Sequence, residues 1–126
     1  PNYLEFGDFL RPWGVVSTLV PTSHLVPLCD LFVAFASATI RWAAACGVPT
    51  INYDIFHYGY NDFANVKGVR TVCASGDFVN LVGTMKPDSD TYREARSLSQ
   101  SDAAYWSVMD GQCIDRIEGV IDAASC

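Results

Sequence analysis

The sequence predicts an α/β fold in which helices cover a mostly parallel sheet, a three-layer Rossmann-like domain. Leu31 to Phe35 forms a continuous apolar run, which is typical of a parallel strand that is buried on both faces. Gly47 and Pro49 end the helical stretch that follows, and residues 48–53 form a second apolar run with β-favouring residues. Two such runs joined by a helix form a βαβ crossover, which is nearly always right-handed.

The N-terminal third is harder to assign. Residues 1–20 hold an alternating piece and a second apolar piece around residues 15–20, interrupted by Gly7, Pro12 and Gly14. Thr22 or Ser23 is a good helix N-cap, so a helix of a turn or two is expected to lead into the first strand.

The second half continues the alternation of strands and helices. Residues 55–67 are rich in Gly, Asn and Asp and also in aromatic residues, which is typical of a binding loop. Residues 69–73 form a third strand candidate, and Ser75 with Asp77 is expected to cap a helix over residues 76–85. Further helices are predicted over residues 90–99, 103–108 and 111–124, the last amphipathic, and those from about residue 90 pack on or beyond the core.

Size and charge limit the function classes. The chain has 126 residues, which suits a single domain over residues 1–126 with one core. It carries a net charge of −6 and only 8 Lys and Arg residues, which are scattered, so a general nucleic-acid-binding surface is excluded. No apolar run reaches membrane-spanning length, and no signal peptide is recognisable. The absence of an initial Met suggests a fragment of a longer protein.

The cysteines do not form a recognisable ligand or disulfide pattern. Five are present, without a CxxC pair and without a nearby His at ligand spacing, so no metal site is predicted. Cys29, Cys46 and Cys73 lie in or beside apolar runs, and we expect them to be buried free thiols. Free thiols are typical of the reducing cytoplasm, so a cytoplasmic location is expected. Any association with a membrane would be made by parts of the protein outside this chain.

The helix that follows the first strand begins with small and hydroxyl-bearing residues. With Ser37 as N-cap, the backbone N–H groups of Ala38, Thr39 and Ile40 are expected to be unpaired and to attract an anion. Arg41 could add a charge-assisted contact. The alternative is a capped helix without a ligand, in which Arg41 pairs with Asp30 or Asp54.

The loop over residues 55–67 supplies polar and aromatic groups that suit a sugar or a base. The candidates are Asp54, His57, Tyr58, Asn61 and Asp62. His57 offers an acid–base group, and the Tyr ring offers a stacking face. Alternatively, the aromatic side chains pack on the sheet, which is the expectation for Phe56 and Phe63, and Asp54 caps the loop in an Asx turn.

Both the turn after the first strand and this loop follow the carboxyl ends of parallel strands, so they are expected to share one cleft. The sequence has no GxGxxG, GK[ST], GxSxG or HExxH motif, so dinucleotide, ATPase, hydrolase and zincin functions lack motif support.

The segment from Asp30-Leu-Phe-Val through Ser37-Ala-Thr to Ala45-Cys-Gly-Val-Pro-Thr-Ile resembles the C-terminal, donor-binding domain of GT-B-fold glycosyltransferases and of the related UDP-N-acetylglucosamine 2-epimerases. The resemblance covers about residues 22–85. It implies that residues 37–41 hold the diphosphate of a UDP- or GDP-sugar and that the 55–67 loop lies near the sugar. It also implies an N-terminal domain that completes the cleft, and no cofactor besides this substrate.

Three functions remain open. The first is the nucleotide-sugar half of a glycosyltransferase in polysaccharide or glycoconjugate synthesis, or half of an epimerase, inactive without the N-terminal domain. The second is a non-catalytic, degenerate Rossmann-like module for protein contacts. Trp42 favours this module, because it stands where many GT-B enzymes carry a Glu for the ribose. The third is a response-regulator-like domain, which lacks the acceptor Asp at the end of the first strand.

Overall fold

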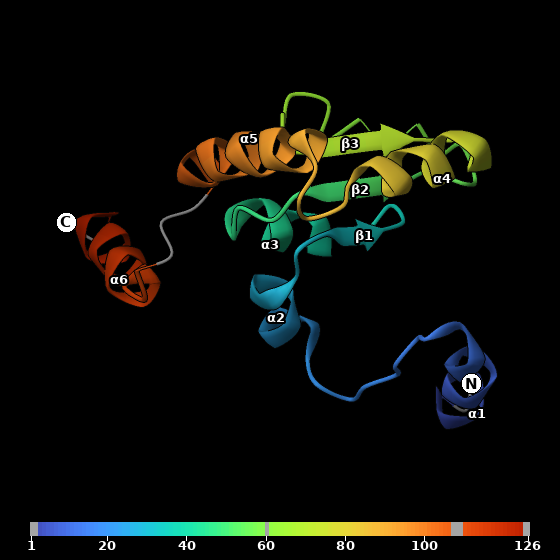
Figure 1. Ribbon diagram of the computed structural model, residues 1–126. Coiled ribbons are helices and arrows are strands. Elements are labelled where there is room, and N and C mark those ends of the chain that lie inside the picture. The colour runs from blue at the N-terminus through green and yellow to red at the C-terminus, as the bar shows by residue number, and fades with distance from the viewer. Residues whose placement is uncertain (1–2, 60, 107–109, 125–126) are drawn as a thin grey trace.

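The centre of the molecule is a three-stranded parallel sheet (Figure 1). The computed structural model describes residues 3–59, 61–106 and 110–124. The strands are β1 (Phe32–Ala34), β2 (Thr50–Tyr53) and β3 (Val69–Val72), in the order β1-β2-β3. The predicted α/β class with a parallel sheet is confirmed.

Side-chain alternation assigns helices to the two faces of the sheet. Phe32, Ala34 and Val69 pack with helix α3 (Thr39–Ala45), so they share the face that this helix covers. Successive residues of β2 point to alternate faces, and Tyr53 points to the face opposite α3. Its ring stacks on Phe78 of helix α4 (Ser75–Thr84), with ring centroids 4.4 Å apart. Helices therefore lie on both faces, as the sequence predicts.

The β1-α3-β2 unit matches the predicted βαβ crossover. Ile40 and Ala44 of α3 are buried against residues of the loop before β3, Phe63 and Val66. Gly47 ends the helix in the left-handed region, with φ of +68°, a conformation that costs a glycine little. The crossover helix therefore contributes much of the core.

The expectation that the first strand is buried on both faces is wrong. Val33 at its centre is 45% exposed, and Phe35 beyond its end is also exposed. The reason is its place in the sheet, since β1 pairs with β2 alone and so forms an edge.

Helix α5 (Asp90–Trp106) is one continuous helix, where the sequence predicts two. Its polar segment, which the prediction treats as a break, faces the start of β3. There the Asp102 carboxylate accepts a hydrogen bond from the Gly68 N–H at 2.7 Å. The Ser99 hydroxyl donates to the Ala95 carbonyl at 2.9 Å, so this buried polar group is satisfied within the helix. Val108, the predicted end of the second helix, lies outside the described residues.

The N-terminal segment lies away from the sheet (Figure 1). It consists of α1 (Tyr3–Leu10) and the 3₁₀ helix η1 (Arg11–Trp13), followed by an irregular stretch up to Pro21. The apolar alternation near the N-terminus did not indicate this helix. The short helix predicted next is present as α2 (Thr22–Leu25) and η2 (Val26–Leu28), with Pro21 rather than Thr22 or Ser23 as its N-cap.

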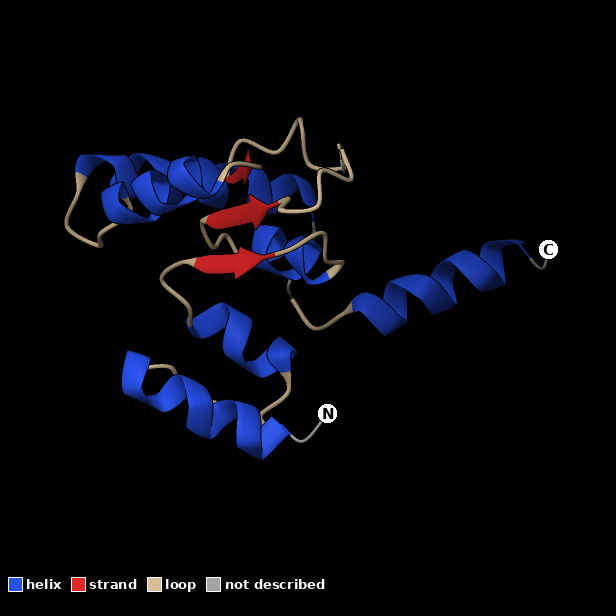
Figure 2. Cartoon of the chain, turned by 90° about the vertical axis from the view of Figure 1, so that its right-hand side faces the viewer, coloured by secondary structure: helices blue, strands red, loops and turns tan. Residues whose placement is uncertain are grey.

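Helix α6 (Cys113–Ala124) confirms the predicted amphipathic C-terminal helix and projects from the body of the molecule (Figure 2). Its apolar residues, among them Ile114, Ile117 and Val120, are exposed. Among the described residues, no helix is both long and apolar enough to cross a bilayer.

The cysteines within the described residues are free thiols, but not all are buried. Cys29 and Cys46 are half-buried, whereas Cys73 is exposed, so the burial predicted for Cys73 is wrong. Cys73 directly follows β3 and precedes α4, where the chain has left the sheet. The N-cap of α4 is Ala74, without a side-chain cap hydrogen bond, so the predicted cap by Ser75 and Asp77 is wrong. Burial raises the pKa of the Cys46 thiol above its ordinary value.

Candidate functional site

Asn52 holds together the carboxyl edge of the sheet. This edge comprises the turn after β1 (residues 35–38) and the loop after β2 (residues 55–67). The Asn52 side chain is fully buried. Its Oδ1 accepts a hydrogen bond from the Ala36 N–H at 3.1 Å, and its Nδ2 donates to the Thr71 hydroxyl at 3.4 Å. Asn52 therefore links the ends of all three strands. Sequence reasoning missed it, although a polar residue inside an apolar strand was the available signal.

The β1 turn is conformationally unusual. Ala36 has φ of +37°, which a residue with a Cβ rarely adopts. The hydrogen bond from its N–H to Asn52 holds this conformation. The turn reverses the chain over a short distance and directs it into α3.

Asp54 organises the loop after β2. It is almost completely buried, and its two carboxylate oxygens accept hydrogen bonds from the Tyr58 and Gly59 N–H groups, both at 2.9 Å. Its carbonyl accepts from the N–H of His57, whose φ is +53°. Of the two roles considered for Asp54, the structure has the loop-capping one. Both carboxylate oxygens hold the loop.

Three aromatic rings meet at the carboxyl edge and are called here the aromatic cluster: Phe35, Phe56 and Tyr58. The Phe35 centroid lies 5.0 Å from that of Phe56 and 5.8 Å from that of Tyr58, and the last two are 5.9 Å apart. Phe56 is 63% exposed and Tyr58 is 68% exposed. The expectation that Phe56 packs on the sheet is wrong, because the turn that follows Asp54 directs its side chain toward solvent. Phe63 lies in the core, as expected. Sequence reasoning missed Phe35.

Helix α3 begins at Thr39 with Ala38 as its N-cap, so the prediction of Ser37 as N-cap is wrong. Of the three N–H groups that the sequence suggested as unpaired, those of Thr39 and Ile40 donate within the protein. The Ile40 N–H donates to the Ser37 carbonyl and the Arg41 N–H donates to the Ala38 carbonyl, both at 3.1 Å. The Thr39 N–H donates to the Ser37 hydroxyl at 3.2 Å, and the Ser37 and Thr39 hydroxyls lie 2.7 Å apart. Because the chain enters the helix through tight turns, the protein itself uses these donors. The two hydroxyls and the Arg41 side chain remain for ligand contact.

Arg41 pairs with Asp62, not with Asp30 or Asp54. One guanidinium nitrogen lies 3.4 Å from the Asp62 carboxylate, and the two side chains are 57% and 49% exposed. An exposed ion pair of this kind contributes at most about 1 kcal/mol, so a ligand could displace Asp62 at low cost. The ion pair connects α3 to the loop after β2, which places both predicted segments at one edge.

The remaining predicted residues, His57 and Asn61, are exposed in the same loop. The Asn61 carbonyl accepts a hydrogen bond from the Ala64 N–H. Among the described residues, no three His, Cys, Asp or Glu side chains gather in a way that could hold a metal ion.

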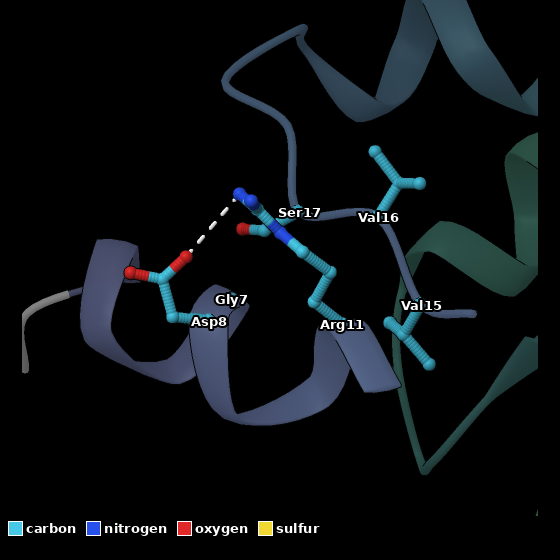
Figure 3. A pocket seen from close by; sticks show the side chains of 6 residues that line it. All are labelled: Gly7, Asp8, Arg11, Val15, Val16 and Ser17. Carbon is cyan, nitrogen blue, oxygen red and sulfur yellow. Dashed lines mark ion pairs between the residues drawn. The ribbon is translucent and has the colours of Figure 1, made fainter. Parts of the chain in front are cut away.

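A hollow lies in the N-terminal segment, far along the chain from the carboxyl edge (Figure 3). It has a volume of about 320 Å³ and is lined by Gly7, Asp8, Arg11, Val15, Val16 and Ser17. Its cation is already paired, since Arg11 lies 3.2 Å from Asp8, and both side chains are exposed. The hollow is open to solvent, and none of the polar residues that line it is buried.

The carboxyl edge thus combines exposed rings and an exposed Arg–Asp pair with two hydroxyls beside the start of α3. The buried Asp54 carboxylate holds the facing loop in place. Comparison of the chain with protein-family models, curated proteins and solved structures finds no match.

Proposed function

We propose that this chain is the nucleotide-sugar-binding half of a glycosyltransferase-like enzyme that acts in polysaccharide or glycoconjugate synthesis. The ligand, a UDP- or GDP-sugar, lies across the carboxyl edge of the sheet. In open α/β sheets, ligands bind outside the carboxyl ends of the strands, and the candidate residues lie there. An N-terminal domain completes the cleft and supplies the catalytic groups, so the isolated chain binds without turnover.

The observation that carries the proposal is the position of Arg41. Its guanidinium reaches from α3 to Asp62 in the facing loop, and its exposure leaves it accessible to a ligand. A phosphate that replaces the Asp62 carboxylate would receive a charge-assisted hydrogen bond of the same geometry. The Ser37 and Thr39 hydroxyls lie 2.7 Å apart beside the start of the same helix, so one donates to the other and the remaining O–H group can donate to the diphosphate.

The test is a titration with UDP, GDP and their sugars, followed by backbone and Arg side-chain NMR signals. Signals of residues 37–41 and of Asp62 should shift first. Arg41→Glu should abolish the shifts and leave the fold intact, because the Arg41 side chain is exposed. Asp62→Asn should strengthen binding by about threefold to tenfold, because the competing carboxylate is removed.

A matched control is Arg93→Glu, which makes the same charge change at an exposed ion pair within α5. This variant should bind as the parent does. Nucleotide binding that survives Arg41→Glu would show that the helix start is not the site, and the absence of any shift at millimolar ligand would overturn the proposal.

A second candidate function is a protein-contact module without catalysis, and exposed apolar side chains favour it. A hollow of about 190 Å³ between η2 and α3 is lined mostly by apolar side chains, among them Val26, Pro27 and Trp42. Trp42 is 49% exposed, and aromatic residues of this kind often dominate binding energy at interfaces. If Trp42→Ala removes binding to a protein partner while nucleotides shift no signal, the module is the better description. Epimerisation would instead require turnover of a UDP-sugar by the two-domain protein.

A further inference from the structure

We propose that the aromatic cluster binds a neutral saccharide directly, without any nucleotide attached. Phe35, Phe56 and Tyr58 stack on the ring faces, and the Arg41–Asp62 pair hydrogen-bonds to the hydroxyls. This inference goes beyond the proposed function, because a diphosphate makes no contribution to it.

The exposure of the rings is the first argument. The core of this region is closed by Phe63, which is almost completely buried, so the cluster is not needed to cover the sheet. Phe56 and Tyr58 instead expose most of their surface beside each other, with 39° between their planes. A saccharide ring has apolar C–H faces and a polar rim. When such a face stacks on exposed aromatic rings, both apolar surfaces are removed from water, which favours binding.

The loop holds these rings in place before any ligand arrives. The N–H groups of Tyr58 and Gly59 are bound by the buried Asp54 carboxylate. Phe35 is held by the neighbouring turn, since the N–H of Ala36, the next residue, donates a hydrogen bond to Asn52. A preorganised site loses less conformational entropy when a weak ligand binds.

The charge of the edge also accommodates a neutral ligand while the Arg41–Asp62 pair is intact. Arg41 is balanced by Asp62 at 3.4 Å, and the buried Asp54 adds a further carboxylate. The N–H groups of Thr39, Ile40 and Arg41 donate within the protein, so they are not available as direct donors to a ligand. A guanidinium beside a carboxylate still offers planar donors and acceptors, which match neighbouring hydroxyl groups.

The test uses the full chain and free cellobiose, with N-acetylglucosamine and glucose as shorter probes, at about 10 mM, which would saturate a millimolar site. Ring signals of Phe35, Phe56 and Tyr58 should shift in NMR spectra recorded without nucleotide. Phe56→Ala or Tyr58→Ala should weaken binding by about tenfold, as for a side chain at the centre of a contact.

Two conservative variants separate ring stacking from general apolar contact. Phe56→Tyr keeps the ring and should keep binding, whereas Phe56→Leu keeps apolar volume and should lose it. Trp13→Ala is the control, because it removes an exposed aromatic side chain from the N-terminal segment and should have no effect.

The outcomes distinguish this inference from the proposed function. Saccharide shifts that are lost in Phe56→Leu, with or without nucleotide binding, support the inference. Nucleotide shifts at residues 37–41 without any response to free saccharide overturn it and leave the proposed function standing. Equal binding by Phe56→Leu and Phe56→Tyr also overturns it, and capture of a protein partner through these rings in place of a sugar would do the same.

Discussion

The sheet with its covering helices and the C-terminal helix α6 are stabilised in different ways. In the sheet region, buried residues from distant parts of the chain meet, such as Ile40 of α3 and Phe63 of the loop before β3. In α6, the large apolar residues are exposed, and an ion pair with Asp110, which lies just before the helix, involves Arg116 of its first turns. The Asp110 carboxylate accepts two hydrogen bonds from Arg116, at 2.7 and 2.9 Å, and one from the Gln112 N–H at 3.0 Å.

The difference shows that an amphipathic pattern determines a helix but not its burial. The apolar residues of α3 and of α6 both recur at helical spacing. In α3, Ile40, Ala43 and Ala44 are buried, although Trp42 is 49% exposed, because α3 connects two paired strands and lies against them. The following substitutions test how far the two regions differ.

The largest effect is expected from Phe63→Ala, which should lower the free energy of unfolding by about 3–5 kcal/mol through the cavity that it leaves. Ile117→Ala in α6 should change it by less than about 0.5 kcal/mol, since that side chain is exposed. Urea denaturation followed by tryptophan fluorescence measures both. Should Phe63→Ala fail to fold, Phe63→Leu provides a milder change at the same site. Equal losses at positions 63 and 117 would contradict the comparison.

A smaller effect is expected from Gly68→Ala. A Cβ added to Gly68 would lie 2.7 Å from the Ser99 Cα and also against the Ser99 hydroxyl, so α5 would have to move away from β3. We expect a loss of about 1–3 kcal/mol in the free energy of unfolding. The matched control is Gly83→Ala in α4, where the added Cβ meets no atom within 4 Å. That variant should gain about 0.5–1 kcal/mol, because alanine favours the helix. If Gly68→Ala gains stability as well, the close contact with α5 is not real.

The smallest effect concerns α6 alone and depends on pH. Hydrogen bonds from Arg116 lower the pKa of Asp110 from 3.8 to about 2. A carboxyl group whose pKa is lower in the folded state stabilises that state above its ordinary pKa, and the contribution is lost as the pH falls toward about 2. The start of α6 should therefore fray over that range, as followed by NMR shifts of residues 113–124 and of the Asp110 carboxyl. Arg116→Gln should return the midpoint of Asp110 toward 3.8, and an unchanged midpoint would refute the pairing.

Much of the fold was predictable, because its signals are local. The apolar runs before and after α3, Gly47 at the end of that helix and the polar loop that follows Asp54 all appear where expected. The errors come from places where local pattern is ambiguous. The polar segment near Ser99 reads as a break, yet contact with Gly68 continues the helix through it. The first apolar run reads as a buried strand, although it lies at an edge.

The candidate site was predictable only in part. The sequence places the β1 turn and the loop after β2 at one edge, because parallel strands end on the same side. It could not show that Phe35 meets Phe56 and Tyr58, since their meeting depends on the turn that Asn52 and Asp54 impose.

By itself, the sequence determined the strands, the crossover helix and the segments that lie at the carboxyl edge, because apolar periodicity and turn residues act over a few neighbouring positions. The tertiary structure decided the pairings among polar groups, such as Arg41 with Asp62 and the first-turn N–H groups with Ser37 and Ala38. Such pairings depend on distances between segments that are remote in the chain or on the exact path of a turn. They also decide which groups the edge offers to a ligand, because the Thr39 and Ile40 N–H groups donate within the protein, whereas the Arg41 side chain stays exposed.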